Sequence, residues 1–394
     1  MTPAARVQAA IDILDQVIAA ARAQGAPADR LIAEWFRPRR FAGSGDRRAV
    51  RELVYAAIRA CGEVPASGRA AMLRLAADDP ALRALFDGSR HAPAAIAPDE
   101  VAAAAGVAPG WLQAALDDSD VAGEDAASLL GRAPLDLRVN ALKADRATLA
   151  LPVAGEPLAS PQGLRLPAGT PVESWDTYRE GRIEVQDLGS QLAALAVGAR
   201  PGETVVDLCA GAGGKTLALA ADMGNAGRIV ACDADRARLA RLAPRAERAG
   251  AAVIEQRLLD GGREAEALRD LAAGADAVLI DAPCSGTGTW RRNPEARWRL
   301  TPARLAQLVL LQARLLDVGA ALVRPGGRLV WVVCSVLDDE GARQVAALRE
   351  RQPGCWQPLD GRLPIGDRRG DGTRFVPGRH GCDGFFVATL LRAC

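Results

Sequence analysis

The sequence has little lysine and histidine, and each shortage narrows the kinds of site it can hold. Only Lys143 and Lys215 are lysines, so the 49 lysines and arginines include 49 minus 2, or 47, arginines. A lysine kept against this bias could mark a place where a compact ammonium suits better than a planar guanidinium; the alternative is chance, which two residues do not exclude. The only histidines are His91 and His380. Neither stands in a recognisable catalytic triad, so we treat both as structural.

Cysteine pairs with metal-ligand spacing are also missing. None of the eight cysteines forms a C-x-x-C pair, which argues against a zinc knuckle or ribbon, and we expect no metal. No signal peptide and no apolar stretch long enough to span a bilayer is recognisable. We therefore expect a cytoplasmic protein with reduced thiols and no membrane partner. We also expect it to be a monomer.

Net charge is the third shortage. The chain carries only +1 at pH 7, with 49% hydrophobic and 25% charged residues. This composition is typical of a soluble globular protein. Any surface that binds nucleic acid must therefore come from local clustering of arginines rather than from the charge of the whole chain.

Residues 1–131 are predicted to form an all-helical domain, because apolar residues such as Ile11, Leu14 and Ile18 recur at helical spacing. A cluster of arginines and aromatic rings follows within it. This cluster could follow a phosphate backbone, or it could be a solvated face with arginine stems packed on rings. Its members are Trp35, Phe36, Arg37, Arg39, Arg40, Phe41, Arg47, Arg48 and Arg51.

Two further regions are predicted after this domain. Residues 132–187 indicate a small α/β element, with strands at 135–140 and 181–186 and a helix beginning near Asp145. From residue 188 to 394, apolar strand-like runs alternate with helix-length segments, which predicts a Rossmann-like, doubly wound α/β sheet. We expect this sheet to be mostly parallel, with an antiparallel pair near Trp356 and at Phe385–Leu391 at its end.

Reactive side chains follow two of the predicted strands. Asp281 and Cys284 come after the apolar run 277–280, and Cys334 comes after the run 328–333. Ligands of open α/β sheets bind beyond the carboxyl ends of the strands, so these three groups should meet at one rim. Free cysteine is usually buried and inert, which is the alternative interpretation. The position at strand ends and the glycine- and proline-rich loop around Cys284 favour function.

The segment 205–216 is predicted to be a strand, a glycine-rich turn and a helix, and three ligands compete for it. A P-loop would fit Gly214–Thr216, but Cys209 replaces its first glycine. A dinucleotide fingerprint would fit Gly211 and Gly213, but Thr216 stands in the third place. The third reading is a nucleoside without pyrophosphate, for which the glycines only permit close approach of the backbone.

Carboxylates after the next strands favour that third reading. Asp233 follows the second predicted strand of this domain, 228–232, where it could accept both ribose hydroxyls, and Asp260 follows the third, 253–256, within reach of an adenine edge. Carboxylates would repel a polyphosphate, whereas they suit a nucleoside that carries a sulfonium. S-adenosylmethionine is therefore the expected cofactor.

A local positive patch follows the Cys284 loop. Arg291, Arg292, Arg297 and Arg299 face only Glu295, and two tryptophans interleave them. This pattern suits stacking of bases and contact with phosphates, so RNA held here would reach the thiols. The alternative is an exposed arginine-rich turn.

Taken together, these segments resemble the RsmB/Sun-type family of RNA cytosine-5 methyltransferases over residues 132–394. The resemblance rests on Arg138–Asn140, Val185–Gln191, Asp207–Thr216, Asp281–Gly288, Arg291–Pro294 and Cys334–Val336. The helical region loosely resembles the NusB-like RNA-binding domain found in that family. Val333 stands where the family usually has threonine, and Gly211-Ala212 where many members have Ala-Pro.

The resemblance implies roles for individual residues. Cys334 would add to carbon 6 of cytosine, Cys284 would assist release, and Asp281 would hydrogen-bond or protonate the ring near N3. The implied cofactor-binding residues are Cys209, Ala210, Gly211, Gly213, Gly214, Lys215, Asp233, Asp260 and Asp281. The implied RNA-binding residues are Arg138, Asn140, Arg291, Arg292 and Arg297.

Small-subunit rRNA is the expected substrate, and three alternatives remain. The chain could methylate tRNA instead. It could be a non-catalytic RNA-binding ribosome assembly factor, although such a protein would be expected to lack one of the thiols. A P-loop ATPase is disfavoured by Cys209.

Overall fold

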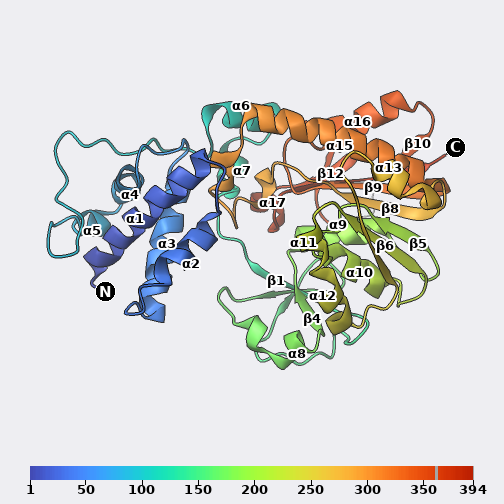
Figure 1. Ribbon diagram of the computed structural model, residues 1–394, viewed down its shortest axis with the longest axis horizontal. Coiled ribbons are helices and arrows are strands. Elements are labelled where there is room, and N and C mark those ends of the chain that lie inside the picture. Colours follow the sequence, from blue (N-terminus) through green and yellow to red (C-terminus); the bar gives the residue numbers. More distant parts are fainter. Residues whose placement is uncertain (360–362, 394) are drawn as a thin grey trace. The chain divides into compact units, whose positions relative to one another are not determined.

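The computed structural model describes residues 1–359 and 363–393. The chain folds into two compact units (Figure 1). The first comprises Met1–Gly131 together with Thr289–Pro302, and the second comprises Arg132–Gly288 together with Ala303–Cys394. The segment that follows the Cys284 loop therefore belongs to the helical unit, although it is far from that unit in the sequence.

The first unit is built from helices. Its long helix α1 carries a continuous apolar face that packs on α3 and α4, and Trp298 of the inserted segment joins the same core. The helices are α1 (Pro3–Arg22), α2 (Ala28–Phe36), α3 (Ser44–Ala60), α4 (Gly68–Ala76), α5 (Pro80–Arg83), α6 (Gly110–Asp118), α7 (Gly123–Ser128) and α14 (Ala296–Arg299).

The small element in residues 132–187 is an antiparallel sheet with strand order β2-β3-β1-β4. The prediction of a helix beginning near Asp145 is wrong, because the structure has no helix in the described stretch between β1 and β2. The Asp145 carboxylate instead accepts a hydrogen bond from the Ala147 N–H at 2.8 Å and closes a turn. The elements are β1 (Leu135–Val139), β2 (Glu156–Pro157), β3 (Gly163–Leu166), η1 (Val172–Ser174), α8 (Asp176–Arg179) and β4 (Ile183–Val185).

The main sheet of the second unit has the order β11-β12-β13-β9-β8-β5-β6-β7, and β10 pairs with β13. The neighbours from β9 to β7 are parallel, whereas β13 runs antiparallel to β9, β10 and β12. The strands are β5 (Thr204–Asp207), β6 (Arg228–Asp233), β7 (Ile254–Leu258), β8 (Ala275–Asp281), β9 (Val323–Val333), β10 (Trp356–Pro358), β11 (Asp367–Arg369), β12 (Gly372–Phe375) and β13 (Phe385–Arg392).

Helices cover both faces of this sheet (Figure 1). Successive strand residues enter different cores: Val205 packs with α9 and α10, and Val206 packs with α15 and α16. This confirms the expected doubly wound α/β fold with an antiparallel last strand. The helices are α9 (Leu188–Val197), α10 (Gly214–Asp222), α11 (Arg236–Leu239), α12 (Leu242–Ala249), α13 (Glu264–Ala267), α15 (Pro302–Leu322), α16 (Ala342–Arg351) and α17 (Pro377–His380), with 3-10 turns η2 (Arg269–Leu271) and η3 (Thr287–Thr289).

Helix α15 corrects the expectation that no apolar stretch is long enough to span a bilayer. It has 21 residues and a mean hydropathy of 1.5, so by length and composition it could cross a membrane. Half of its apolar window is buried, and Leu315 and Leu316 pack in the core on one face of the sheet. A core helix of an α/β unit passes the same test, so the length of this apolar run has an explanation in the fold.

Candidate active site

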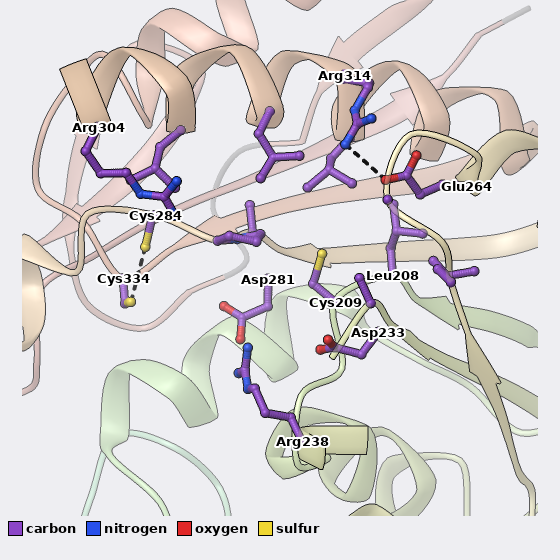
Figure 2. Close-up of a pocket in the computed structure, with 18 residues that line it drawn as sticks. Leu208, Cys209, Asp233, Arg238, Glu264, Asp281, Cys284, Arg304, Arg314 and Cys334 are labelled. Atoms are coloured by element: carbon purple, nitrogen blue, oxygen red, sulfur yellow. Dashed lines mark hydrogen bonds and ion pairs between the residues drawn. The ribbon is translucent and has the colours of Figure 1, made fainter. Parts of the chain in front are cut away.

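The two thiols singled out in the sequence lie next to each other. Strands β8 and β9 are parallel neighbours with Asp281 paired to Val332, so the segments that follow them leave the sheet at the same rim. There the sulfur of Cys284 lies 3.3 Å from the sulfur of Cys334, as Figure 2 shows. Asp281 lies at the same rim and lines the same cavity.

Glycine at position 288 makes this approach possible. The Gly288 N–H donates to the Cys334 carbonyl at 3.1 Å, and the Gly384 N–H donates to the Gly288 carbonyl at 2.8 Å. A Cβ atom at position 288 would lie 1.9 Å from the Gly384 carbonyl oxygen. The Cys284 loop is therefore fastened directly to the Cys334 segment through the backbone, at a point where no side chain fits.

The environment of Cys284 holds its proton. The hydrogen bond with Cys334 raises the pKa of the Cys284 thiol well above its usual range, and burial and the nearby charge of Glu340 act in the same direction. Cys284 is therefore a thiol at neutral pH, able to donate its S–H to the neighbouring sulfur.

Asp281 is paired with one of the two lysines. The Lys215 ammonium lies 2.6 Å from the Asp281 carboxylate and 5.5 Å from the centre of the Phe385 ring. Burial alone would lower the pKa of Lys215, but the charge of Asp281 and the hydrogen bond to it raise that pKa above its ordinary value. Lys215 is therefore a fixed cation beside the carboxylate at the rim.

The glycine-rich turn is shaped by Asp233 at the end of β6. Its carboxylate accepts hydrogen bonds from the N–H groups of Gly211 and Asp235, each at 2.7 Å. Gly211 and Gly213 have φ angles of +56° and +84°, which favour glycine. A Cβ at Gly213 would lie 2.1 Å from a methyl carbon of Leu242. The turn therefore packs so closely that only glycine fits at this position.

A cavity of about 550 Å³ joins these features (Figure 2). Among the predicted cofactor-binding residues, Cys209, Asp233 and Asp281 line it, together with both thiols. Asp260, whose side chain is exposed, does not line it, although its neighbours Leu259 and Gly261 do. Ala210, Gly211, Gly213, Gly214 and Lys215 form the adjoining turn and the start of α10 without lining the cavity.

Several wall residues were not predicted: Arg238, Glu264, Arg304 and Arg314. In Figure 2 the ion pair between Arg314 and Glu264, at 3.1 Å, lies at the end of the view opposite the thiols. Arg304 and three leucines of α15 line the cavity at positions 304, 308, 311 and 315. That is the spacing of one helical face, so this part of the wall could have been found in the sequence.

Two predicted RNA-binding residues in the small sheet are buried. Arg138 is 5% exposed and donates from Nε to the Gln186 side-chain oxygen at 2.7 Å. Asn140 is 2% exposed and donates to the Gly181 and Ala249 carbonyls, both at 2.8 Å. Both side chains hold segments of the protein together, and neither is presented on the surface for direct contact with RNA.

The arginine patch after the Cys284 loop is also largely internal. Arg297 is 0% exposed, donates to the Ile58 and Cys61 carbonyls at 2.6 and 2.7 Å, and has a pKa that burial lowers to about 9. Arg291 is 6% exposed. The expectation of an RNA-contacting patch therefore needs correction for both residues, because the segment packs into the helical unit. Arg292 remains on the surface.

The state of the cysteines differs in one place from the expectation of reduced thiols. Within the described residues, Cys355 is disulfide-bonded, while Cys61, Cys209, Cys232, Cys284, Cys334 and Cys382 are free thiols. Cys394 lies outside the described residues. The described parts, 1–359 and 363–393, contain no group of three or more His, Cys, Asp or Glu side chains arranged to hold a metal ion.

The part of the chain that carries this site is similar to known proteins. Residues 194–391 match the family model described as 16S rRNA methyltransferase RsmB/F. A probable ribosomal RNA small subunit methyltransferase B of Synechocystis sp. is 36% identical over 270 residues, which cover 66% of this chain and 60% of that protein. The ribosomal RNA small subunit methyltransferase B of Citrobacter koseri is 34% identical over 235 residues, covering 59% of this chain and 53% of its own length. The matched region thus spans between about half and 60% of these relatives.

Solved structures share the architecture. The crystal structure of PH0851 aligns with a TM-score of 0.74 at 25% identity and covers 99% of both chains. The structure of NSun6 from Pyrococcus horikoshii with SFG aligns with a TM-score of 0.61 at 19% identity, covering 73% of this chain and 98% of that one. The second likeness concerns the fold alone.

Proposed function

The chain belongs to the RsmB/F family of 16S rRNA methyltransferases, and we propose that it transfers a methyl group from S-adenosylmethionine to carbon 5 of a cytosine in RNA, with small-subunit rRNA as the substrate. One observation carries this proposal. Two thiols lie 3.3 Å apart on the wall of one cavity that Asp281 also lines. A second thiol beside the first is what a covalent mechanism with a separate release step needs.

The residues around the cavity suit S-adenosylmethionine. The glycine-rich turn adjoins the cavity, and the Asp233 carboxylate lines its wall next to that turn. When bound, the cofactor supplies an electrophilic methyl group on a sulfonium and leaves as a thioether. Asp233 would hold the ribose. NSun6 from Pyrococcus horikoshii, which shares the fold, was solved with the S-adenosylmethionine analogue SFG.

Cys334 is the proposed nucleophile. Carbon 5 of cytosine is a poor nucleophile until a thiolate adds to carbon 6, which moves electron density to carbon 5. The S–H of Cys284, whose sulfur lies 3.3 Å from the Cys334 sulfur, can donate a hydrogen bond to it and hold it in place for the attack. Asp281 would hydrogen-bond the ring near N3, with Lys215 holding the carboxylate in place.

Release requires the proton on carbon 5 to leave and the bond between carbon 6 and sulfur to break. We assign this step to Cys284: its S–H would give its proton to the expelled Cys334 sulfur 3.3 Å away, and the Cys284 thiolate that remains would accept the proton from carbon 5. The target base must be unpaired or extruded to reach the thiols.

The RNA partner is proposed to meet exposed arginines. Arg292 is exposed directly after the Cys284 loop, and in the helical unit Arg37, Arg40, Arg48 and Arg51 are exposed near Phe41, which is 73% exposed. Charges of one sign beside an exposed ring suit single-stranded RNA. We propose that the protein is cytoplasmic and acts as a monomer. Light scattering of the purified chain would test its oligomeric state.

The direct test supplies S-adenosylmethionine with a labelled methyl group together with unmodified small-subunit rRNA, tRNA or neither. Labelled 5-methylcytosine in nucleosides from the rRNA supports the proposal. Label confined to tRNA would replace the substrate by the first alternative. Binding of rRNA without any transfer of label would support a non-catalytic assembly factor.

A further inference from the structure

A buried carboxylate lies behind the two thiols. Glu340 is 0% exposed and follows the Cys334 segment in a turn before α16. A buried carboxylate without partners is strongly unfavourable, so the groups around it show what it is for. Within the described residues its recorded partners are neutral hydrogen-bond donors rather than arginine or lysine. Its placement is therefore not explained by an ion pair.

Those donors belong to the Cys284 loop and to α15. The Ser285 N–H donates to Glu340 Oε1 at 2.8 Å, and the Ser285 hydroxyl donates to Oε2 in a second, short contact. The Gln312 amide donates to Oε1 at 3.0 Å and to the Pro283 carbonyl at 2.9 Å. Glu340 and Gln312 thus fix the residues on either side of Cys284.

The same network reaches the other thiol. The hydroxyls of Ser285 and Ser335 lie 3.3 Å apart, and the Thr287 and Ser335 hydroxyls lie 2.9 Å apart. The Val336 N–H donates to the Thr287 hydroxyl at 3.0 Å. Each catalytic cysteine is thus followed by a serine of this network. The single proton of Ser285 goes to the carboxylate, because a bond to a charged acceptor is the stronger one.

The turn itself is held in place. The Glu340 carbonyl accepts from the Trp331 indole N–H at 3.0 Å, and Trp331 is fully buried in β9. A Cβ at Gly341 would lie 2.7 Å from the Phe386 ring, so the chain packs tightly just after the carboxylate. Glu340 is therefore attached to the rigid sheet, and the loop that carries Cys284 is attached to Glu340.

We propose that Glu340 is a positioning residue that clamps Ser285 and thereby holds the Cys284 thiol against Cys334. This inference rests on the proposed function for the roles of the two cysteines, but the geometry it describes does not. The clamp fixes the separation of the sulfurs before RNA arrives. Loss of the clamp should affect the step assigned to Cys284 more than the attack by Cys334.

A disulfide assay reads this geometry without RNA or cofactor. A diazene oxidant such as diamide takes two electrons and the two thiol protons from Cys284 and Cys334, becoming a hydrazine while the sulfur–sulfur bond forms. The rate of this reaction depends on how well the two sulfurs are held together. Peptide mass spectrometry identifies the 284–334 pair among the other cysteines.

Glu340→Gln is expected to slow formation of this disulfide about tenfold. The amide has one acceptor oxygen where the carboxylate has two, and it carries no negative charge. Ser285→Ala is expected to do the same, and combining the two should add little to either alone. Asp339→Asn is the matched control. It removes the same charge from the preceding residue, whose side chain is 45% exposed and pairs with Arg343, and it should leave the rate unchanged.

In methyl transfer, Glu340→Gln should accumulate RNA–protein adduct at an unchanged KM for RNA. General destabilisation would instead lower adduct and turnover in parallel. A wild-type disulfide rate in folded Glu340→Gln would overturn the proposal. If that variant does not fold, a wild-type rate in Ser285→Ala would overturn it equally. If disulfide formation is slow in the variants but the wild-type protein transfers no methyl group to RNA, the clamp stands and the proposed function is contradicted instead.

Discussion

The Lys215 ammonium lies 2.6 Å from the Asp281 carboxylate at the rim of the main sheet. One of only two lysines in an arginine-rich chain is thus placed beside a group proposed to contact the target base. The pair is partly shielded from water, with side-chain exposures of 9% for Lys215 and 32% for Asp281. A compact ammonium can orient the carboxylate without covering the face that the base would meet.

Lys215→Met is therefore expected to lower kcat roughly 10- to 100-fold, because Asp281 loses the cation that orients it. Methyl transfer to rRNA at saturating cofactor measures this. Lys143→Met is the matched control, since that exposed ammonium donates to the carbonyls of Glu180, after α8, and of Arg248, in α12. Equal kcat in wild type and Lys215→Met would show that the ion pair has no part in turnover.

Gly213→Ala should weaken binding of S-adenosylmethionine, because a Cβ there would lie 2.1 Å from Leu242 Cδ1 and force the glycine-rich turn to move. Gly224→Ala provides the comparison. Gly224 also has a positive φ, +58°, but a Cβ there meets nothing within 4 Å. The Gly224→Ala substitution should lower the free energy of unfolding by about 1 kcal/mol through backbone strain alone and leave the affinity for S-adenosylmethionine unchanged. Calorimetric titration distinguishes the two, and equal affinity of both variants would remove the turn from the cofactor site.

Arg297→Met should destabilise the helical unit by roughly 3 kcal/mol, because the buried guanidinium satisfies the Ile58 and Cys61 carbonyls. Arg292→Met, at an exposed position five residues earlier, should change stability by less than about 0.5 kcal/mol while weakening RNA binding. Urea unfolding followed by circular dichroism gives both free energies. An Arg297→Met variant as stable as wild type would contradict the structural role given to that side chain.

Asp207 should make stability depend on pH. Burial raises its pKa to about 7 from the ordinary value of 3.8, against the Thr216 hydrogen bond that lowers it. The folded state therefore binds a proton that the unfolded state has released between about pH 4 and pH 7. Stability contributed by this group is full below about pH 4 and is lost as pH rises toward 7. The difference between wild type and Asp207→Asn, measured by urea unfolding at several pH values, should follow this trend; a difference that is constant with pH would contradict it.

Much of the main sheet could be predicted because its central strands are buried on both faces. The run at 277–280 is apolar throughout and the run at 328–333 is apolar after Arg328, and the structure confirms both as parts of β8 and β9. Strands β11 and β12 were missed because Asp367–Arg369 and Gly372–Phe375 carry charges and glycine and pair at the edge of the sheet. An edge strand has no continuous apolar run to mark it.

Some residues of the site could likewise be placed from the sequence, whereas others could not. The sequence pattern brought Asp281, Cys284 and Cys334 to one rim, since that follows from strand order alone. It could not show that Arg297 is buried, because an arginine beside tryptophan has the same local pattern on a surface as in a core. Nor could it choose Glu340 over Asp338 and Asp339. Asp338 is buried as well, against Arg369, and which neighbouring carboxylate meets the Cys284 loop is decided by the packing of the turn on Trp331 and Phe386.

The most direct test of the proposed function traps the covalent intermediate. Cys284→Ala is incubated with S-adenosylmethionine and unmodified small-subunit rRNA, beside wild type and Cys284→Ala/Cys334→Ala, and run on denaturing gels. We predict an RNA–protein adduct that accumulates in Cys284→Ala, stays low in wild type and vanishes in the double variant. An adduct that persists without Cys334, or none in Cys284→Ala while wild type methylates the same RNA, would contradict the roles given to the two thiols.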